Sequence, residues 1–208
     1  MVLVAVCLSQ THGRYSSKKA FNNSTASGYG GGVSAAGLNV TVCFCVFNED
    51  SARYAFGFCG FCTALNKITS NTFIKCGNTN ANPTDAAWVT QYGWTVSEFN
   101  NGSSNICRDR GACYVSRDGG SSQEIKFDMY MSNDCIWVFG LACSVNKSKQ
   151  CVSSICLANN TAQESVYSWY GAFLVKNCIF SDNIPIVANY PNYHRDVTFL
   201  ECTFAHEE

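Results

Sequence analysis

The chain has 208 residues, with 14 Lys and Arg against 15 Asp and Glu, and a formal net charge of −1. That length suits one domain, or two small ones, with a real core, and a near-neutral chain without a long basic run excludes the electrostatic footprint of a nucleic-acid partner. Charged residues make up 14% of the chain, against roughly 25% in typical globular domains, so neutral polar residues must form much of the surface.

The first segment, MVLVAVCLSQTHGR, is an apolar run followed by small residues before Arg14. This pattern predicts a signal peptide over residues 1–13, although the positively charged start of such peptides is missing. The same run also suits a first β-strand. No later run reaches the roughly 20 apolar residues of a membrane-spanning helix. We therefore expect a protein of the secretory pathway that is extracellular, either secreted or an ectodomain cut free of its anchor.

Period-two patterning dominates the rest of the chain. Residues 14–36 are polar and Gly-rich and are expected to form a flexible lead-in, followed by a single β-rich glycosylated domain over 37–208. The clearest alternation of apolar residues lies in 38–47, 124–131 and 196–204. Less regular apolar runs, bounded by Asn, Gly, Ser or Asp, lie at 54–58, 72–76, 87–96, 135–143, 165–175 and 184–188.

Helical patterning is weak, with 84–92 as the best helical candidate, and no internal repeat is evident. We therefore predict an all-β fold, a disulfide-rich β-sandwich of about eight to ten strands joined by long loops.

The 14 cysteines are typical of an oxidising compartment and a disulfide framework. If Cys7 leaves with the signal peptide, thirteen remain, and an odd number implies one free thiol or one disulfide to another chain. The expected partners therefore include further copies of the chain, in a disulfide-linked or non-covalent oligomer. The disulfide candidates are Cys43, Cys45, Cys59, Cys62, Cys76, Cys107, Cys113, Cys135, Cys143, Cys151, Cys156, Cys178 and Cys202.

The segment LNVTVCFCVFNEDSARYAFGFCGFC holds four of them. Zinc is disfavoured because Cys43 and Cys45, two apart on a strand, do not converge on one ion. Redox chemistry is disfavoured because Cys59-Gly-Phe-Cys62 lacks the helix N-terminus that activates an exchange thiol. We expect no metal ion and no cofactor.

A structural role for this segment is favoured. An antiparallel hairpin centred near residue 51 would place Cys43 opposite Cys59, within disulfide range. Local loops between Cys107 and Cys113, and between Cys151 and Cys156, suit similar closures, but the connectivity does not follow from the sequence.

Six N-x-[ST] sequons support a secretory route. Because the first two overlap, we expect only one of them to be used. The acceptor asparagines are Asn22, Asn23, Asn39, Asn101, Asn146 and Asn159.

No sequence motif of a hydrolase, metalloprotease or nucleotide-binding site is present, and we expect no enzymatic activity. Clustered aromatic residues instead suit recognition of carbohydrate or protein. Two clusters are Trp88, Tyr92 and Trp94, and Tyr167, Trp169 and Tyr170. The polar loop ANYPNYHRD gives our predicted receptor contacts, Tyr190, Tyr193, His194 and Arg195.

The leading apolar segment, the sequons and the run FGFCGFCTALN together resemble an RNA-virus envelope surface glycoprotein, and are similar to the N-terminal S1 region of a coronavirus-type spike. The resemblance implies a galectin-like β-sandwich that binds a host cell-surface glycan or protein receptor. It also implies a location at the virion surface, and contacts between a fragment of this kind and other parts of the same glycoprotein. No stretch matches a diagnostic motif, so no binding residue is carried over.

The predicted function is therefore attachment and recognition by a viral envelope glycoprotein. One alternative is a secreted Cys-rich structural or effector protein with no attachment role. Another is a secreted hydrolase or thiol–disulfide enzyme.

Overall fold

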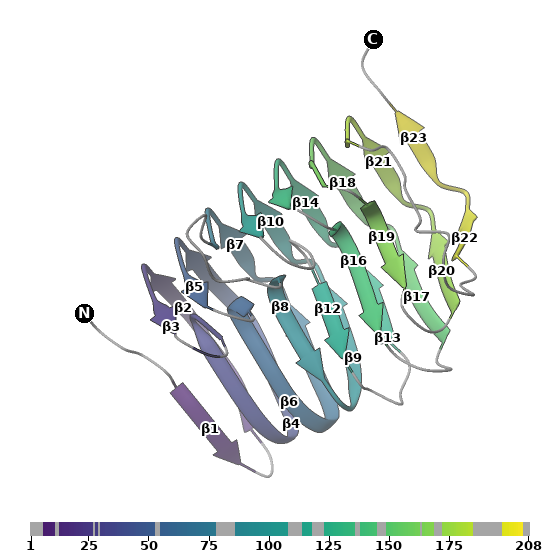
Figure 1. Cartoon of the computed structure of the whole chain (residues 1–208). Helices are drawn as coiled ribbons and strands as arrows, with labels where there is room; N and C mark the ends of the chain where they lie inside the picture. The colour runs from purple at the N-terminus through teal and green to yellow at the C-terminus, as the bar shows by residue number, and fades with distance from the viewer. Residues whose placement is uncertain are drawn as a thin grey trace.

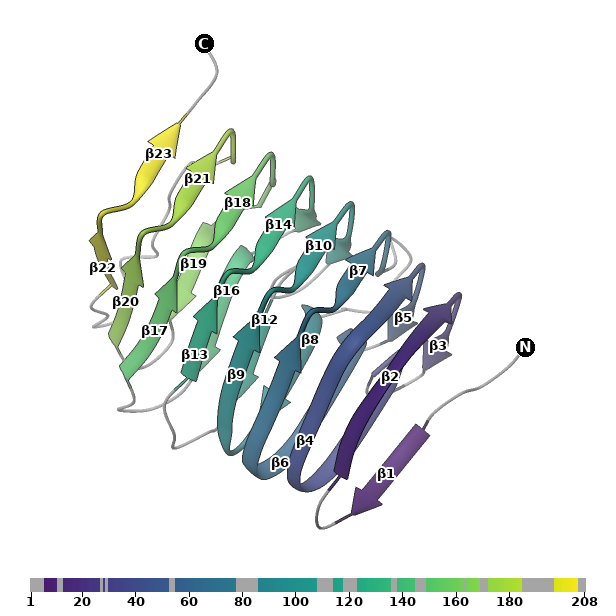
Figure 2. The same cartoon turned by 180° about the vertical axis from the view of Figure 1, so that it is seen from behind.

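The chain folds as a parallel β-solenoid, in which successive coils stack on one another with their strands in register (Figures 1 and 2). This computed structural model describes residues 6–10, 13–26, 28, 30–52, 55–77, 86–107, 114–117, 123–135, 138–144, 149–162, 164–168, 172–184 and 197–205. These residues are all-β, and no helix among them is long and apolar enough to cross a membrane.

Three faces run the length of the solenoid. Face A stacks the last residues of β2 (Gly13–Asn22) and β4 (Val33–Asn48) with β7 (Thr72–Ile74), β10 (Asn101–Ser103), β14 (Met129–Met131), β18 (Cys156–Ala158), β21 (Ile179–Ser181) and β23 (Thr203–Ala205). Face B stacks earlier parts of β2 and β4 and the end of β6 (Ala55–Thr69) with β9 (Trp94–Glu98), β13 (Gln123–Lys126), β17 (Lys149–Ser153), β20 (Ala172–Lys176) and β22 (Val197–Leu200).

Face C stacks β1 (Val6–Gln10) and the first parts of β4 and β6 with β8 (Ala86–Gln91), β12 (Tyr114–Arg117), β16 (Val138–Ser144) and β19 (Glu164–Ser168). Short pairs join β3 (Thr25–Ala26) to β5 (Ser51–Ala52) and β11 (Ile106–Cys107) to β15 (Asp134–Cys135). β1 and β23 lie at opposite ends of the stack (Figure 1).

The predicted β-sandwich is wrong. Period-two alternation reports only that one side of each strand is buried, and that is true of a sandwich and of a solenoid alike. Here every strand pairs in parallel with the equivalent strand of the next coil, whereas a sandwich of this kind is antiparallel.

The predicted Cys43–Cys59 hairpin is also wrong, because β4 and β6 pair in parallel. Cys59 lies beside Ser34, near one end of the shared register, and Cys43 lies beside Thr69 at the other end. The turn between them returns the chain to the start of the next coil, so the two cysteines lie far apart along the strands.

The expected flexible lead-in and the helical candidate are both wrong, because the structure has strands in these two segments. The polar stretch 14–36 contains most of β2, all of β3 and the start of β4. The helical candidate 84–92 contains β8. At the N-terminus, β1 pairs in parallel with Val33–Gly37, as the strand alternative allowed; removal of residues 1–13 as a signal peptide stays a prediction.

Stacked aromatic rings fill the interior behind face A. The ring centroids of Phe21 and Phe47 lie 5.0 Å apart, and those of Phe47 and Phe73 lie 4.8 Å apart, with the rings of each pair stacked nearly parallel. The next coil has Gly102 at this position, where an added Cβ would collide with the ring of Tyr130. A missing side chain in one coil thus makes room for a large one in the next.

Candidate functional site

Each coil turns from face B to face A through a buried residue, and leaves face A through a second buried residue five positions later. Turns interrupt the backbone pairing of the strands, and buried N–H and C=O groups must still find partners. Amide side chains that stack in register supply those partners. The first ladder contains Asn71, Asn100 and Asp128, and the second ladder contains Asn105, Asn133, Asn160 and Asn183.

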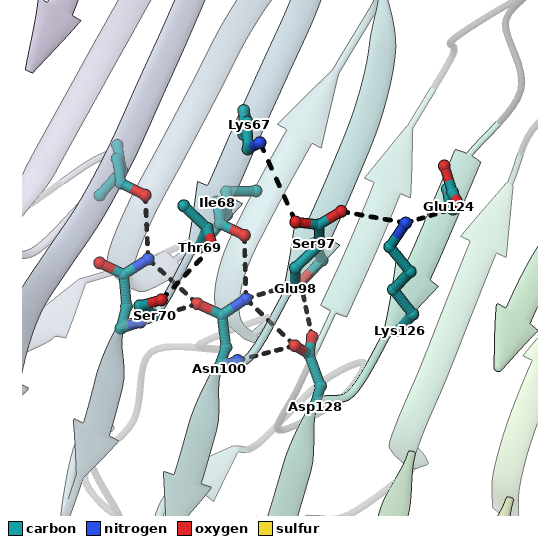
Figure 3. A network of polar contacts seen from close by, with 12 residues as sticks. Lys67, Ile68, Thr69, Ser70, Ser97, Glu98, Asn100, Glu124, Lys126 and Asp128 are labelled. Carbon is teal, nitrogen blue, oxygen red and sulfur yellow. Dashed lines mark hydrogen bonds and ion pairs between the residues drawn. The ribbon is translucent and has the colours of Figure 1, made fainter. Parts of the chain in front are cut away.

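The first ladder is shown in Figure 3. The backbone N–H and the side-chain amide of Asn71 both donate to Oδ1 of Asn100, at 3.0 Å. Asn100 in turn donates from its backbone N–H to Oδ1 of Asp128 at 2.8 Å, and from Nδ2 to the carbonyl of Ile68 at 3.0 Å. Each rung therefore satisfies backbone groups of two coils.

Asp128 ends the first ladder. The next coil has Ile155 at this position, and Ile has no side-chain acceptor. The Asp128 carboxylate has no N–H group that would need one. Asp128 accepts from Ser97 Oγ at 2.5 Å and from the Tyr130 hydroxyl at 3.4 Å. Burial raises the pKa of Asp128 to about 7, although the bonds from Ser97 and Asn100 act in the opposite direction.

The second ladder is more uniform. The backbone N–H and Nδ2 of each Asn donate to Oδ1 of the next, from Asn105 to Asn133, Asn160 and Asn183, over 2.8–3.0 Å. Asp50 lies on the same line two coils before Asn105 and accepts from the Ser24 backbone N–H at 2.7 Å. Burial raises the pKa of Asp50 to about 6.

The residue before each ladder position has a positive φ of 50–58°, in the left-handed region that favours Gly. Before the second ladder these residues are small or polar. On the first ladder the same position holds Phe99 before Asn100 and Phe127 before Asp128, with φ of 57° and 58°. Phe44, with a φ of 55°, precedes Cys45, whose backbone N–H donates to Asn71 and so extends this ladder by one coil.

These phenylalanines are the candidate functional site. Phe44, Phe99 and Phe127 are 56%, 57% and 48% exposed, and the rings of Phe99 and Phe127 stack at 5.0 Å with an interplanar angle of 11°. Val46 and Met129, the first outward residues of face A after Phe44 and Phe127, are exposed as well. We call these five residues the apolar corner.

An ion-pair cluster on face B is shown in Figure 3. Two of its members, Glu98 and Lys126, directly precede Phe99 and Phe127 in the chain. Lys126 Nζ lies 3.1 Å from both Glu98 and Glu124, and Lys67 Nζ lies 3.9 Å from Glu98. Hydrogen bonds to Glu124 and Glu98 raise the pKa of Lys126. Within the described ranges, no group of three His, Cys, Asp or Glu side chains is placed to hold a metal ion.

No protein-family model, curated protein or solved structure matches this chain.

The predicted receptor contacts Tyr190, Tyr193, His194 and Arg195 lie outside the described residues. Of the other aromatic candidates, Trp88 is fully buried, and its Nε1 donates to the Tyr130 hydroxyl at 3.2 Å, so it belongs to the core. Tyr92 and Trp94 are exposed. The side chains of Tyr167, Trp169 and Tyr170 lie outside the described part.

The sequon asparagines differ in exposure. Asn22, Asn23 and Asn159 are exposed, Asn39 and Asn101 are half-buried, and Asn146 lies outside the described residues. Asn159 sits on a left-handed turn next to the buried Asn160. Glycan attachment to any of them stays a prediction.

Several of the cysteines proposed for disulfides carry thiols in this structure, and many of them are buried. These are Cys62, Cys76, Cys135, Cys151, Cys156, Cys178 and Cys202. The Cys59–Cys62 motif lies within strand β6, and burial raises the pKa of Cys62 to about 11. Thiol exchange needs the opposite shift. The Cys107–Cys113 closure involves Cys113, which lies outside the described residues.

Sequence reasoning missed both ladders and the apolar corner. The signal that reveals them is a pair of short or polar residues five positions apart, with a large apolar residue or Gly between them; Ile155 replaces the first of the pair in one coil. It recurs as CVFNED, NTFIKC, NNGSSN, DMYMSN, ICLANN and CIFSDN.

Proposed function

We propose that the protein is an extracellular recognition scaffold whose apolar corner contacts a host cell-surface glycan or protein receptor. The observation that carries the proposal is the backbone beneath the exposed phenylalanines. A non-Gly residue at a φ of 55–58° costs of order 1 kcal/mol or more. Gly or Asn would lower that cost, and a side chain half in water recovers little of it by burial.

Strain and exposure therefore coincide at Phe44, Phe99 and Phe127. Strained positions of this kind cluster at functional sites. Phe99 and Phe127 are in contact, and contiguous exposed apolar groups mark interaction surfaces. Phe44 lies farther along the same corner, beyond the coil that carries Ser70. The ion-pair cluster beside them supplies a polar rim, as at many protein interfaces.

The exposed sequons support a secretory route. Origin in an RNA-virus envelope, with the remainder of that glycoprotein as a partner, stays a prediction from the sequence. The sandwich that this resemblance implied is replaced by a solenoid, so the proposal uses the solenoid's own surface.

The test is a double substitution, Phe99→Asn with Phe127→Asn, which removes the exposed rings and keeps residues that tolerate a positive φ. We expect at least a tenfold loss of binding to cultured animal cells or to a glycan array. The matched control is Ser104→Asn with Ser132→Asn, at exposed left-handed positions before the second ladder, which should bind like the wild type. Equal binding by the two double variants, or no binding by the folded wild type, would contradict the proposal.

A further inference from the structure

Two cysteines stand directly above one another in the last two described coils. β20 pairs with β22 and β21 with β23, in register on both sides of Cys178 and Cys202. The backbone N–H of Thr203 donates to the carbonyl of Cys178 at 2.8 Å. Since neighbouring strands lie about 4.8 Å apart, the two Cα atoms fall within the range of roughly 4.4–6.8 Å that a disulfide spans.

The two sulfur atoms also occupy equivalent places. Cys178 Sγ lies 3.0 Å from the carbonyl of Lys176, and Cys202 Sγ lies 3.5 Å from the carbonyl of Leu200, in each case two residues back. Cys202 Sγ also lies 3.5 Å from the carbonyl of Val175, in the earlier coil. The Cys202 thiol therefore already reaches across the gap between the coils.

We propose that Cys178 and Cys202 form an inter-coil disulfide when the folded protein meets a disulfide oxidant such as oxidised glutathione. This assignment is independent of the recognition role. It selects one pair from the thirteen candidate cysteines on the basis of register.

The reaction balances as two thiol–disulfide exchanges. Cys202, the less buried of the two, loses its proton to solvent and attacks one sulfur of oxidised glutathione, which releases one reduced glutathione and leaves a mixed disulfide. Cys178 then loses its proton and attacks the Cys202 sulfur, which releases the second glutathione. Burial raises the pKa of Cys178 to about 12, with a further contribution from the Cys202 thiol, so the second step should accelerate as pH rises.

Cys151 and Cys156 have other residue types at the equivalent positions of the adjacent coils. Cys151 stands between Glu124 and Leu174 of the adjacent coils, and Cys156 stands between Met129 and Ile179. Cys107 and Cys135 are register partners as well, and there the side chain of Cys107 lies outside the described residues.

The cross-link would tie the coil of β22 and β23 to the coil before it. The coil of β22 and β23 is the last one described, and its inward-facing Phe204 is 45% exposed. We therefore expect oxidation to slow amide hydrogen exchange at Thr203 by at least about tenfold.

The experiment is peptide mapping of the full folded chain after incubation with oxidised glutathione. Trypsin cleaves after Lys176 and Arg195, so residues 177–195 and 196–208 form two peptides with one cysteine each. We expect these peptides to appear joined, two hydrogens lighter than their sum, and to separate on reduction. Cys151→Ser should keep this product and Cys202→Ser should abolish it.

The proposal fails if both cysteines stay open to alkylation after oxidation. It also fails if either one is found as a glutathione adduct only, or joined to a different cysteine. The decisive measurement is made on the wild-type chain, so the test does not depend on whether a cysteine variant folds.

Discussion

Oδ1 of Asn133 accepts two hydrogen bonds from Asn105, one from its backbone N–H at 3.0 Å and one from its side-chain amide at 2.9 Å. Asn133 then repeats the arrangement toward Asn160 at 2.9 and 2.8 Å. Its Nδ2 also reaches back to the carbonyl of Gly102 at 3.3 Å. One buried side chain thus joins three coils.

Asn133→Ala should therefore destabilise the solenoid by about 3–5 kcal/mol. It leaves two donors of Asn105 buried without partners, and an unsatisfied buried group costs roughly 1–3 kcal/mol. It also removes the bonds from Nδ2 to the Gly102 carbonyl and to Asn160 Oδ1. Urea unfolding followed by circular dichroism measures the change. Asn22→Ala, at an exposed side chain, is the control and should change stability by less than about 0.5 kcal/mol. A similar effect at both positions would show that the ladder contributes nothing.

The left-handed turns give a second prediction. Ser132 is exposed, with a φ of 54°, and a Gly there avoids the strain but gains freedom in the unfolded chain. Ser132→Gly should change stability by no more than about 1 kcal/mol, in the stabilising direction.

Ser132→Val should destabilise by about 2 kcal/mol, because a β-branched side chain tolerates positive φ worst. The thermal midpoints of the two variants give the comparison. Ser153, an ordinary position on strand β17, is the control, and there the order should reverse because Val suits a strand better than Gly. The same order at both positions would refute the role of the turn.

The Tyr130 ring fills the space that a side chain at position 102 would occupy, which gives a third prediction. Gly102→Ala should cost about 1–3 kcal/mol through overpacking against the Tyr130 ring. Combining it with Tyr130→Leu, the residue that the next coil has at this position, should show a favourable coupling of about 1 kcal/mol. Gly28→Ala meets no atom within 4 Å and should be nearly neutral. Strict additivity of the two changes would mean that the close approach is unimportant.

The sequence predicted the β-class, and its period of two placed Val40, Val42 and Ile125 on one face, which is the buried one. The same alternation put Phe44 and Phe127 on that face as well. That part is wrong, because their positive φ shifts the alternation and both rings are exposed.

The sequence did not show the direction of pairing, which depends on where the chain returns after each turn. Coils of 23 to 29 residues hide the repeat, since loops of different length separate short motifs of fixed spacing. Leu38–Phe47 therefore suited a sandwich as well as a solenoid.

The candidate site was harder to predict for a local reason. Phe99 and Phe127 each precede a buried polar residue, and in a strand such neighbours point to opposite sides. The pattern alone makes the rings appear as part of an irregular apolar run. Only the positive φ turns them outward at the corner, and backbone conformation of this kind is not encoded by hydrophobicity.

The buried carboxyl of Asp128 gives the last prediction, a dependence of stability on pH. An unfolded Asp has a pKa of about 3.9, whereas burial raises the pKa of Asp128 to about 7 in the folded protein. The folded state therefore holds this proton more tightly. The resulting stabilisation is complete below about pH 4 and is lost as pH rises to about 7. Asp50, whose pKa burial raises to about 6, adds a loss of the same sign.

Asp128→Asn keeps the shape of the side chain and removes its titration. Its Oδ1 can still accept from Asn100, and its amide can donate to the oxygen of Ser97. We expect the variant to gain stability relative to wild type as pH rises from 4.5 to 8, by about 2–4 kcal/mol, when urea midpoints are compared across that range. Ser132→Asn, which introduces no titratable group at an exposed position, is the control and should keep a constant difference from the wild type at every pH. A difference between Asp128→Asn and wild type that stays constant from pH 4.5 to 8 would mean that Asp128 titrates as it does in the unfolded chain, and that its burial does not hold the proton.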